Sequence, residues 1–271
     1  MVNELVNFLS KLTTKAIEVK PDILVLDFTI VNACVVGTAN QWVLVDTGLS
    51  NSEEFILKST IKRYDGRPKA IILTHGHFDH VGSVKMLSER WDVPVFAHPL
   101  EMPYLSGQKN YPLADPTVDE GMVAKMSPSF PHEAINIRFR LAELPPDGSI
   151  PGMPGWKWIH TPGHTEGHVS LFRDSDKTLL VGDAFTTTKQ ESLLSILTRK
   201  EKIKGPPAYL TTDWEKARNS VAQLKGLEPE LVIPSHGAPM RGEKLKEHLE
   251  FLTQNFSEIA VPDQGRFVEK N

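Results

Sequence analysis

The stretch Thr74-His75-Gly76-His77-Phe78-Asp79-His80 decides the fold class of this chain. Four of its seven residues carry imidazole or carboxylate groups, which bind divalent metal ions. The apolar run Lys69–Leu73 before it predicts a buried strand, and Asp79–Arg90 after it predicts a helix. Because a tight turn at the end of a strand presents several side chains together, the stretch predicts a metal site at one edge of a sheet.

Three further metal-binding side chains follow in the second half of the chain. His164 lies after a Pro-Gly turn, Asp183 follows a buried strand-like run, and His236 lies between Ser235 and Gly237 just past another such run. Imidazole and carboxylate ligands suit Zn²⁺, Fe²⁺ or Mn²⁺, and no cysteine lies near these motifs. Seven candidate ligands are too many for one tetrahedral ion, so their number favours two ions.

Strand-like runs alternate with amphipathic stretches along the chain, which predicts an α/β fold rather than an all-β one. The other predicted strands are Ile23–Phe28, Ile30–Val36, Trp42–Val45, Val93–Ala97, Ile135–Leu141, Trp156–His160, Val169–Arg173, Thr178–Val181 and Glu230–Pro234. The other predicted helices are residues 1–15, Ser52–Tyr64 capped by Ser52, Thr188–Thr198, Asp213–Leu224 capped by Asp213, and Gly242–Phe256. No linker or repeat interrupts the pattern, so we expect a single domain over residues 1–271.

Residues 99–131 break this alternation. They contain six prolines and no clean helical or strand period. A long irregular segment inside a compact domain is often functional. We expect the segment either to cap the substrate site as a lid or to form a small satellite core of methionine and aromatic side chains.

The composition excludes several classes of function. Lysine plus arginine number 30 against 34 for aspartate plus glutamate, and no basic cluster is present, so we expect no nucleic-acid partner. The apolar runs are far shorter than the roughly 20 residues that cross a bilayer. The first 15 residues lack the features of a secretory signal, and the single cysteine, Cys34, excludes an internal disulfide. We therefore expect a cytoplasmic protein that acts on a small molecule and does not contact membranes.

These motifs, together with Val45-Asp46-Thr47-Gly48, resemble the metallo-β-lactamase superfamily from about Cys34 to Gly237. The resemblance implies a four-layer αβ/βα sandwich, with two mixed sheets facing each other, helices outside and a metal site on one edge. It implies that one metal ion is bound by His75, His77 and His164, and the other by Asp79, His80 and His236. Asp183 would bridge the two ions, Asp46 would support the ligands from behind, and His168 is expected to play a similar supporting part.

The resemblance implies a hydrolase that uses a hydroxide bound by two divalent ions, with Zn²⁺ the first expectation and Fe²⁺ or Mn²⁺ also compatible. We expect a small acyl substrate, an ester, lactone or thioester, with Asp183 and Asp79 catalytic and Asp79 passing a proton to the leaving group. The segment Ala97-His98-Pro99-Leu100-Glu101 is similar to that of a bacterial metallo-hydrolase group.

Three departures narrow this expectation. A true β-lactamase of the best-known class would have a cysteine in place of Asp183, together with a secretory signal. A glyoxalase-type thioesterase would carry a sizeable helical domain after His236, where only 35 residues follow, since 271 − 236 is 35. Some lactonases have a tyrosine where this chain has Thr186, so the sequence argues against this type of lactonase.

The alternatives remain open at this point. A sulfur (persulfide) dioxygenase would hold a single Fe²⁺ through His75, His164 and Asp183, and would leave positions for O₂. A nuclease or phosphodiesterase, and a binding protein without turnover, are the less favoured alternatives. The second set of ligands, Asp79, His80 and His236, argues against a protein that has kept the fold and lost its catalytic activity.

Overall fold

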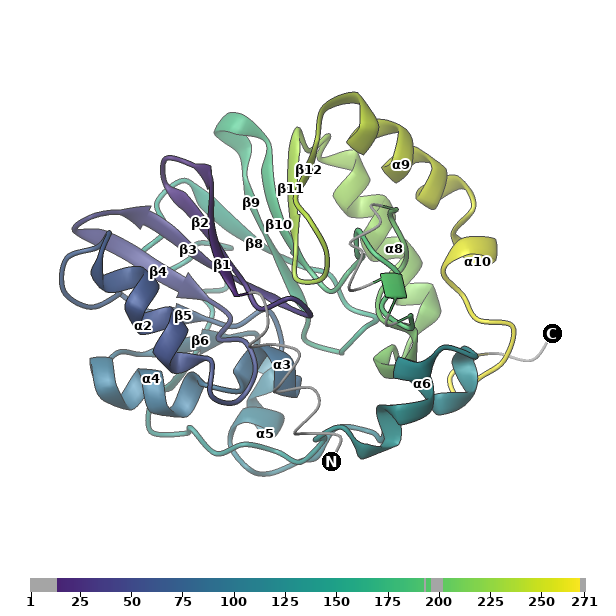
Figure 1. Ribbon diagram of the computed structural model, residues 1–271, viewed down its shortest axis with the longest axis horizontal. Coiled ribbons are helices and arrows are strands. Elements are labelled where there is room, and N and C mark those ends of the chain that lie inside the picture. Colours follow the sequence, from purple (N-terminus) through teal and green to yellow (C-terminus); the bar gives the residue numbers. More distant parts are fainter. Residues whose placement is uncertain (1–13, 193, 196–201, 269–271) are drawn as a thin grey trace. The chain divides into compact units, whose positions relative to one another are not determined.

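The computed structural model describes residues 14–192, 194–195 and 202–268 (Figure 1). The chain divides into two compact units, and each is built around its own β-sheet. The first unit comprises residues 1–111 and 131–156, and the second comprises residues 112–130 and 157–271. The helix expected over residues 1–15 falls outside the described residues up to residue 13, and Lys15 already belongs to a strand.

The first unit contains, among the described residues, a seven-stranded mixed sheet. Its strands pair in sequence order: β1 (Lys15–Lys20), β2 (Ile23–Asp27), β3 (Asn32–Thr38), β4 (Gln41–Val45), β5 (Ile71–Ile72), β6 (Val95–Ala97) and β7 (Leu141–Glu143). Strands β1 to β4 are antiparallel, and β4 to β7 are parallel. Its helices are α2 (Glu53–Ile61), α3 (Phe78–Val81), α4 (Val84–Trp91), the 3₁₀ turn Pro99–Glu101 and α5 (Met102–Leu105). Ile56 of α2 and Leu87 of α4 pack with Leu44 and Ile71 of the strands in one apolar core.

The second unit has a mixed sheet whose described strands pair in the order β12-β11-β10-β9-β8. The strands are β8 (Trp156–His160), β9 (Val169–Arg173), β10 (Thr178–Gly182), β11 (Leu231–Pro234) and β12 (Met240–Arg241). Its helices are α6 (Met122–Met126), α8 (Trp214–Gly226), α9 (Gly242–Gln254), α10 (Phe256–Ile259) and the 3₁₀ turns Pro116–Val118, Ser127–Ser129, Asp174–Asp176 and Ala208–Leu210. Val221 of α8 and Leu249 of α9 share an apolar core with the strand residues Val181 and Val232.

The single helix expected over Asp79–Arg90 is wrong, because two helices, α3 and α4, replace it with a break at Gly82 and Ser83. At the break the Gly82 N–H donates to the Gly48 carbonyl at 2.9 Å. A β-carbon on Gly82 would lie 2.2 Å from the Leu49 carbonyl carbon. The break therefore exists because the chain after β4 passes directly against the turn between the two helices.

Other expectations differ in detail. The strand expected over Ile135–Leu141 begins only at Leu141, because a turn in which the Arg140 N–H donates to Ile137 leaves Phe139 fully in solvent. Ser52 precedes α2 but makes no side-chain capping bond, whereas Asp213 caps α8 as predicted by accepting from the Lys216 N–H. Of the helix expected over Thr188–Thr198, residues 188–192 form turns and bends, and most of the remainder is outside the described residues.

Residues 99–131 form short helices of three to five residues rather than a long loop, and they divide between the two units after Tyr111. Prolines stand in the first turn of several of these helices, where the missing N–H costs nothing. None of the described helices combines the length and apolar character that a membrane span requires.

Candidate metal centre

The histidine motif is buried in the first unit, directly after β5. His75 and His77 lie in the turn after the strand, and Asp79 and His80 lie on α3. The Nε2 atom of His75 and the Nδ1 atom of His77 are 3.0 Å apart. Two nitrogen ligands of one tetrahedral zinc ion would lie about 3.3 Å apart. The two rings therefore already point their nitrogens at a common position, as two ligands of one ion do.

Asp46 and Thr74 fix the proton on two of these histidines. The Asp46 carboxylate accepts from the Nδ1 of His80 at 2.9 Å, and from both the N–H and the hydroxyl of Thr74 at 2.8 Å. The Thr74 hydroxyl has thus used its single proton, so it accepts from the Nδ1 of His75 at 3.1 Å. Both histidines then carry their lone pair on Nε2, and in His80 this atom lies 3.9 Å from the Asp79 Oδ1.

A buried glutamate and tyrosine hold the backbone between His75 and His77, which the sequence did not indicate. The Gly76 N–H donates to the Glu101 Oε2 at 3.1 Å and to the Tyr111 hydroxyl at 3.0 Å, and the same hydroxyl donates to Glu101. The Tyr111 ring lies 4.5 Å from the His77 ring, centroid to centroid. Burial and the neighbouring Glu101 raise the pKa of Tyr111 well above its usual value, so this hydroxyl stays protonated. Residues 99–111 therefore pack against the histidine motif.

In the second unit, the Asp183 carboxylate contacts two histidines. Its Oδ2 atom is 3.3 Å from the Nε2 of His164 and 3.1 Å from the Nε2 of His236. Asp183 and His236 follow β10 and β11, which are adjacent and parallel, so their carboxyl ends meet at one edge of the sheet. All three side chains are buried. One carboxylate oxygen shared by two imidazoles is the arrangement expected of a bridging metal ligand.

His164 is oriented by the segment that precedes α8. The Thr211 hydroxyl donates to the Pro207 carbonyl at 2.8 Å and therefore accepts from the Nδ1 of His164 at 3.1 Å, which leaves the lone pair on Nε2. Gly163 has φ +131°, and a β-carbon there would lie 2.3 Å from the backbone nitrogen of Ala217 on α8. A glycine is required because the turn that carries His164 lies directly against this helix.

His168 contacts Asp183 through the backbone. The Asp183 N–H donates to the Nε2 of His168 at 2.8 Å, so the His168 proton is on Nδ1, which bonds the Thr161 carbonyl at 3.1 Å. Both ring nitrogens of this fully buried histidine are thereby occupied. His168 orients the segment that carries Asp183 and offers no nitrogen to a metal.

The donor set fits a divalent metal. Each unit contributes its own candidate ligands, namely His75, His77, Asp79 and His80 in the first and His164, Asp183 and His236 in the second. Only nitrogen and oxygen donors are present, which suits Zn²⁺, Fe²⁺ and Mn²⁺. Three of the histidines are held by a partner on Nδ1, which is how proteins orient an imidazole toward a metal through Nε2.

A family model described as the metallo-beta-lactamase superfamily matches residues 26–236. The chain belongs to this superfamily. A probable metallo-hydrolase of Bacillus subtilis (strain 168), YflN, is 46% identical over 222 residues, covering 81% of this chain and 84% of YflN. A second Bacillus subtilis (strain 168) protein, the probable metallo-hydrolase YybB, is 31% identical and covers 72% of this chain and 74% of its own length. This member of the metallo-β-lactamase superfamily is thus a metallo-hydrolase, as expected.

Solved structures confirm the fold class. The BLEG-1 B3 metallo-beta-lactamase has a TM-score of 0.58 at 23% identity and covers 89% of this chain and all of its own. The protein TTHA1623, solved in a di-iron-bound form, has a TM-score of 0.55 at 24% identity and covers 85% of this chain and 94% of its own. The α/β architecture predicted from the alternation of strands and helices, with the two mixed sheets that the resemblance implied, is that of the metallo-β-lactamase superfamily.

Proposed function

We propose that this metallo-hydrolase cleaves a small acyl compound, an ester, lactone or thioester, and that it does so with two bound divalent metal ions. The observation that carries the proposal is the buried set of seven candidate ligands, in which three of the five imidazoles are oriented through Nδ1 by a neighbouring residue. A non-catalytic binding protein would not need two complete sets of ligands.

The two sets of ligands would form one dinuclear centre. One ion would be bound by His75, His77 and His164, the other by Asp79, His80 and His236, and both by Asp183. Neither unit alone contains seven ligands, and the contact of Asp183 with both His164 and His236 supports its sharing between two ions. Zinc is the first choice for this nitrogen and oxygen set, and iron and manganese fit the same ligands.

Bound divalent ions supply Lewis-acid activation of water and of the substrate carbonyl. The residues of the chain position these groups and move the proton. Asp79 is buried at the start of α3, beside His80, and we assign to its carboxyl group the proton transfer to the leaving group. Asp46 and His168 hold His80 and Asp183, respectively, in place through the hydrogen bonds described above.

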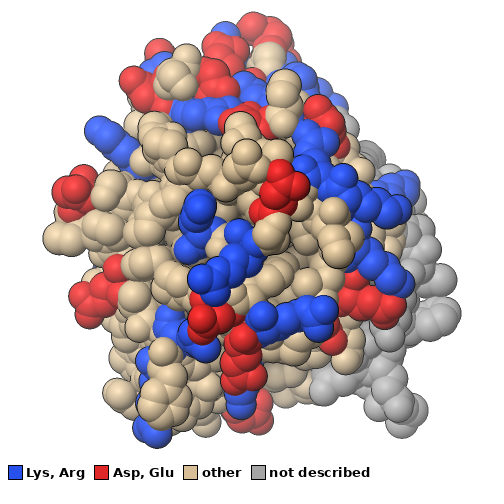
Figure 2. Space-filling model, turned by 90° about the vertical axis from the view of Figure 1, so that its left-hand side faces the viewer, with Lys and Arg blue, Asp and Glu red and all other residues tan. Residues whose placement is uncertain are grey.

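The substrate is proposed to be a small molecule, and residues 99–131 are proposed to cap its site. Two large apolar side chains of this segment, Leu113 and Met122, are exposed, which suits contact with an acyl group. On the face drawn in Figure 2, lysine and arginine side chains are interleaved with aspartate and glutamate rather than gathered in one stripe. This distribution favours neither a nucleic acid nor an anionic membrane as a partner.

The decisive assay compares hydrolysis with oxygen consumption. The zinc- or manganese-loaded enzyme should cleave aryl esters, lactones or thioesters without oxygen. A metal ion that acts as a Lewis acid does not change its oxidation state, and Zn²⁺ has no redox chemistry. Replacement of His80 or His236 by alanine should abolish this activity. Oxygen uptake with glutathione persulfide by the iron-loaded enzyme, tolerant of both replacements and without hydrolysis in any metal form, would contradict the proposal and establish the dioxygenase.

A further inference from the structure

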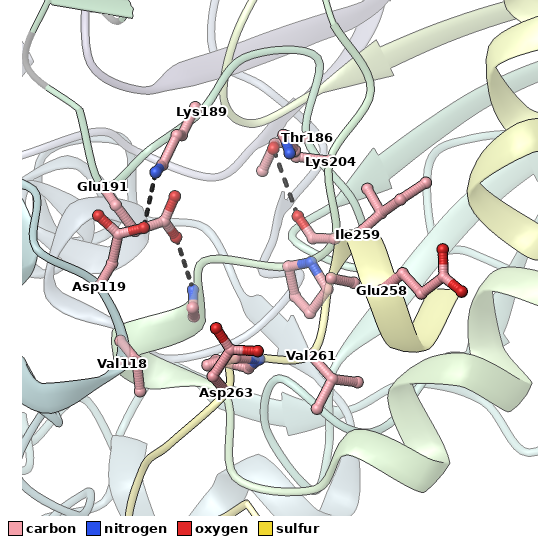
Figure 3. A pocket seen from close by; sticks show the side chains of 15 residues that line it. Val118, Asp119, Thr186, Lys189, Glu191, Lys204, Glu258, Ile259, Val261 and Asp263 are labelled. Atoms are coloured by element: carbon pink, nitrogen blue, oxygen red, sulfur yellow. Dashed lines mark hydrogen bonds and ion pairs between the residues drawn. The ribbon is translucent and has the colours of Figure 1, made fainter. Parts of the chain in front are cut away.

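A hydrogen-bond chain inside the second unit links Val181, Ser170, Thr161 and His168 to the backbone of Asp183. Thr161 directly follows β8, His168 precedes β9, Ser170 lies within β9, and Val181 belongs to β10. The three polar residues of the chain are at most 1% exposed. Figure 3 draws a cavity of about 190 Å³ in this unit, and none of these residues lines it. Polar groups buried this deeply are nearly always hydrogen-bonded, and here they bond one another.

The direction of each hydrogen bond follows from the Val181 end. The Ser170 hydroxyl donates to the Val181 carbonyl at 2.9 Å. Its single proton is then used, so it accepts from the Thr161 hydroxyl at 3.1 Å. The Thr161 hydroxyl in turn accepts from the Nδ1 of His168 at 2.9 Å, and the Thr161 carbonyl lies 3.1 Å from the same nitrogen. From this end, the His168 proton is on Nδ1.

The Asp183 end requires the same position for the proton. The Asp183 N–H donates to the Nε2 of His168 at 2.8 Å, so this nitrogen carries the lone pair. A proton on Nε2 would place two N–H groups against each other and leave the Asp183 N–H buried without this acceptor. Because both ends agree, the hydrogen-bond chain has a single arrangement of its protons.

The hydrogen-bond chain begins and ends on the same short stretch of backbone. Ser170 holds the Val181 carbonyl, and His168 holds the Asp183 N–H, so the backbone is fixed on both sides of Gly182. Gly182 has φ +60°, a conformation that favours glycine. The Asp183 carboxylate follows this turn directly, so the two hydrogen bonds restrain where it lies.

We propose that Thr161 and Ser170 are positioning residues that hold the Asp183 carboxylate in its metal-binding position. They act on the backbone around Asp183, through His168 on one side and through the Val181 carbonyl on the other. The carboxylate lies within 3.3 Å of two candidate histidine ligands, so a small displacement would misplace it for an ion that they share. The proposal rests on the proposed metal binding through Asp183, but neither on hydrolysis nor on the number of ions.

The zinc affinity of the purified full-length protein, measured by competition with a chelator, tests the proposal. Ser170→Ala removes the donor to the Val181 carbonyl, and Thr161→Val removes the central hydroxyl at nearly constant volume. Each should weaken zinc binding about tenfold, at the lower end of the effects of residues that support a metal ligand. Thr161→Ser should bind zinc within about twofold of the wild type, because serine offers the same donor and acceptor.

Thr178→Val is the matched control on β10. Thr178 is a buried threonine at the other end of this strand, and among the described residues its hydroxyl has no hydrogen-bond partner. Its replacement should change zinc affinity less than about twofold, since no hydrogen bond is lost. The double variant of Ser170→Ala and Thr161→Val should bind zinc at most about threefold more weakly than either single variant, because effects within one network are not additive. Two independent packing defects would multiply their losses instead.

Nitrogen NMR of the zinc-loaded wild type with isotope-labelled histidine adds a readout that needs no variant. The His168 ring should carry its proton on Nδ1 and no metal on Nε2. A proton on Nε2 would overturn the proposal, as would the absence of zinc binding by the wild type. Wild-type zinc affinity in both Ser170→Ala and Thr161→Val, an equal loss in Thr178→Val, or multiplied losses in the double variant would also overturn it.

The melting temperature of each variant verifies its fold. If Ser170→Ala or Thr161→Val does not fold, the position of the His168 proton in the wild type decides. A wild type that binds zinc but does not hydrolyse acyl compounds would contradict only the proposed hydrolysis.

Discussion

His168 shows how one side chain can serve the candidate centre without offering a ligand. Its Nε2 accepts the Asp183 N–H, and its Nδ1 is held by Thr161. Loss of the ring would release the segment that places the Asp183 carboxylate between His164 and His236. Residues that orient metal ligands typically contribute 10–100-fold to metal affinity or activity.

We therefore expect His168→Ala to reduce metal affinity or kcat/KM by roughly 10–100-fold while the protein remains folded. Metal titration with a competing chelator and hydrolysis assays measure both quantities. His248→Ala is the control, because His248 lies on α9 away from the motifs. Wild-type metal affinity and rate in His168→Ala would show that the contact with Asp183 is only structural.

Tyr111 supports the turn between His75 and His77 in the first unit. Tyr111→Phe removes the hydroxyl that bonds both Gly76 and Glu101, and leaves a buried carboxyl group with one donor fewer. We expect a several-fold loss of metal affinity, because the turn that spaces His75 and His77 is less restrained. Tyr64→Phe, in which the ring still packs on Trp42, is the control. Unchanged metal affinity in Tyr111→Phe, together with lower stability, would reduce Tyr111 to a packing residue.

At the residue scale, the sequence indicated the candidate ligands and two supporting residues, Asp46 and His168, but not Glu101 and Tyr111. His75, His77, Asp79 and His80 stand together in seven residues, so local spacing alone marks them. Glu101 and Tyr111 reach Gly76 only through tertiary packing, and nothing in their local sequence indicates that contact. The assignment of all seven ligands to two ions stays a prediction until metal content is measured.

At the scale of the elements, Gly82 separates α3 from α4 for steric reasons. Its backbone is in the right-handed helical region, so an added methyl group acts only through the close approach of Leu49 and Ser50. We expect Gly82→Ala to lower the free energy of unfolding by about 2–3 kcal/mol. Gly226→Ala at the end of α8 is the control, because a β-carbon there meets no atom within 4 Å. It should change stability by less than about 1 kcal/mol.

Denaturant unfolding measures both glycine variants. Equal stability of Gly82→Ala and the wild type would contradict the close packing of the turn against the segment after β4. A loss of stability in Gly226→Ala as large as in Gly82→Ala would instead point to a general intolerance of alanine at glycine positions.

The strands that were predicted best are β8 and β9, whose bounds agree with the expected ones and whose sequences are rich in aromatic and aliphatic side chains. β12 has only two residues and is defined by its pairing with β11, so the local sequence could not predict this strand. Ile135 and Ile137 pack against the first core, and their N–H groups donate to the carbonyls of Tyr104 and Leu105 outside any of the named strands. Periodicity reports burial, and burial does not require a strand.

At the scale of the whole molecule, the candidate ligands divide four to three between the two units. Their separation in sequence, from residue 75 to residue 236, means that only the complete fold can gather them. The superfamily match over residues 26–236 covers all seven. The central claim is therefore that the folded chain binds two divalent ions through ligands from both units.

The metal content of the purified protein, after zinc loading and removal of excess metal, tests this claim most directly. Mass spectrometry of the metals should give about two zinc ions per chain in the wild type. His236→Ala should lose one ion, and His75→Ala should lose mainly the other. A wild-type value of one ion per chain that does not rise when Zn²⁺ or Mn²⁺ is added would contradict the dinuclear centre.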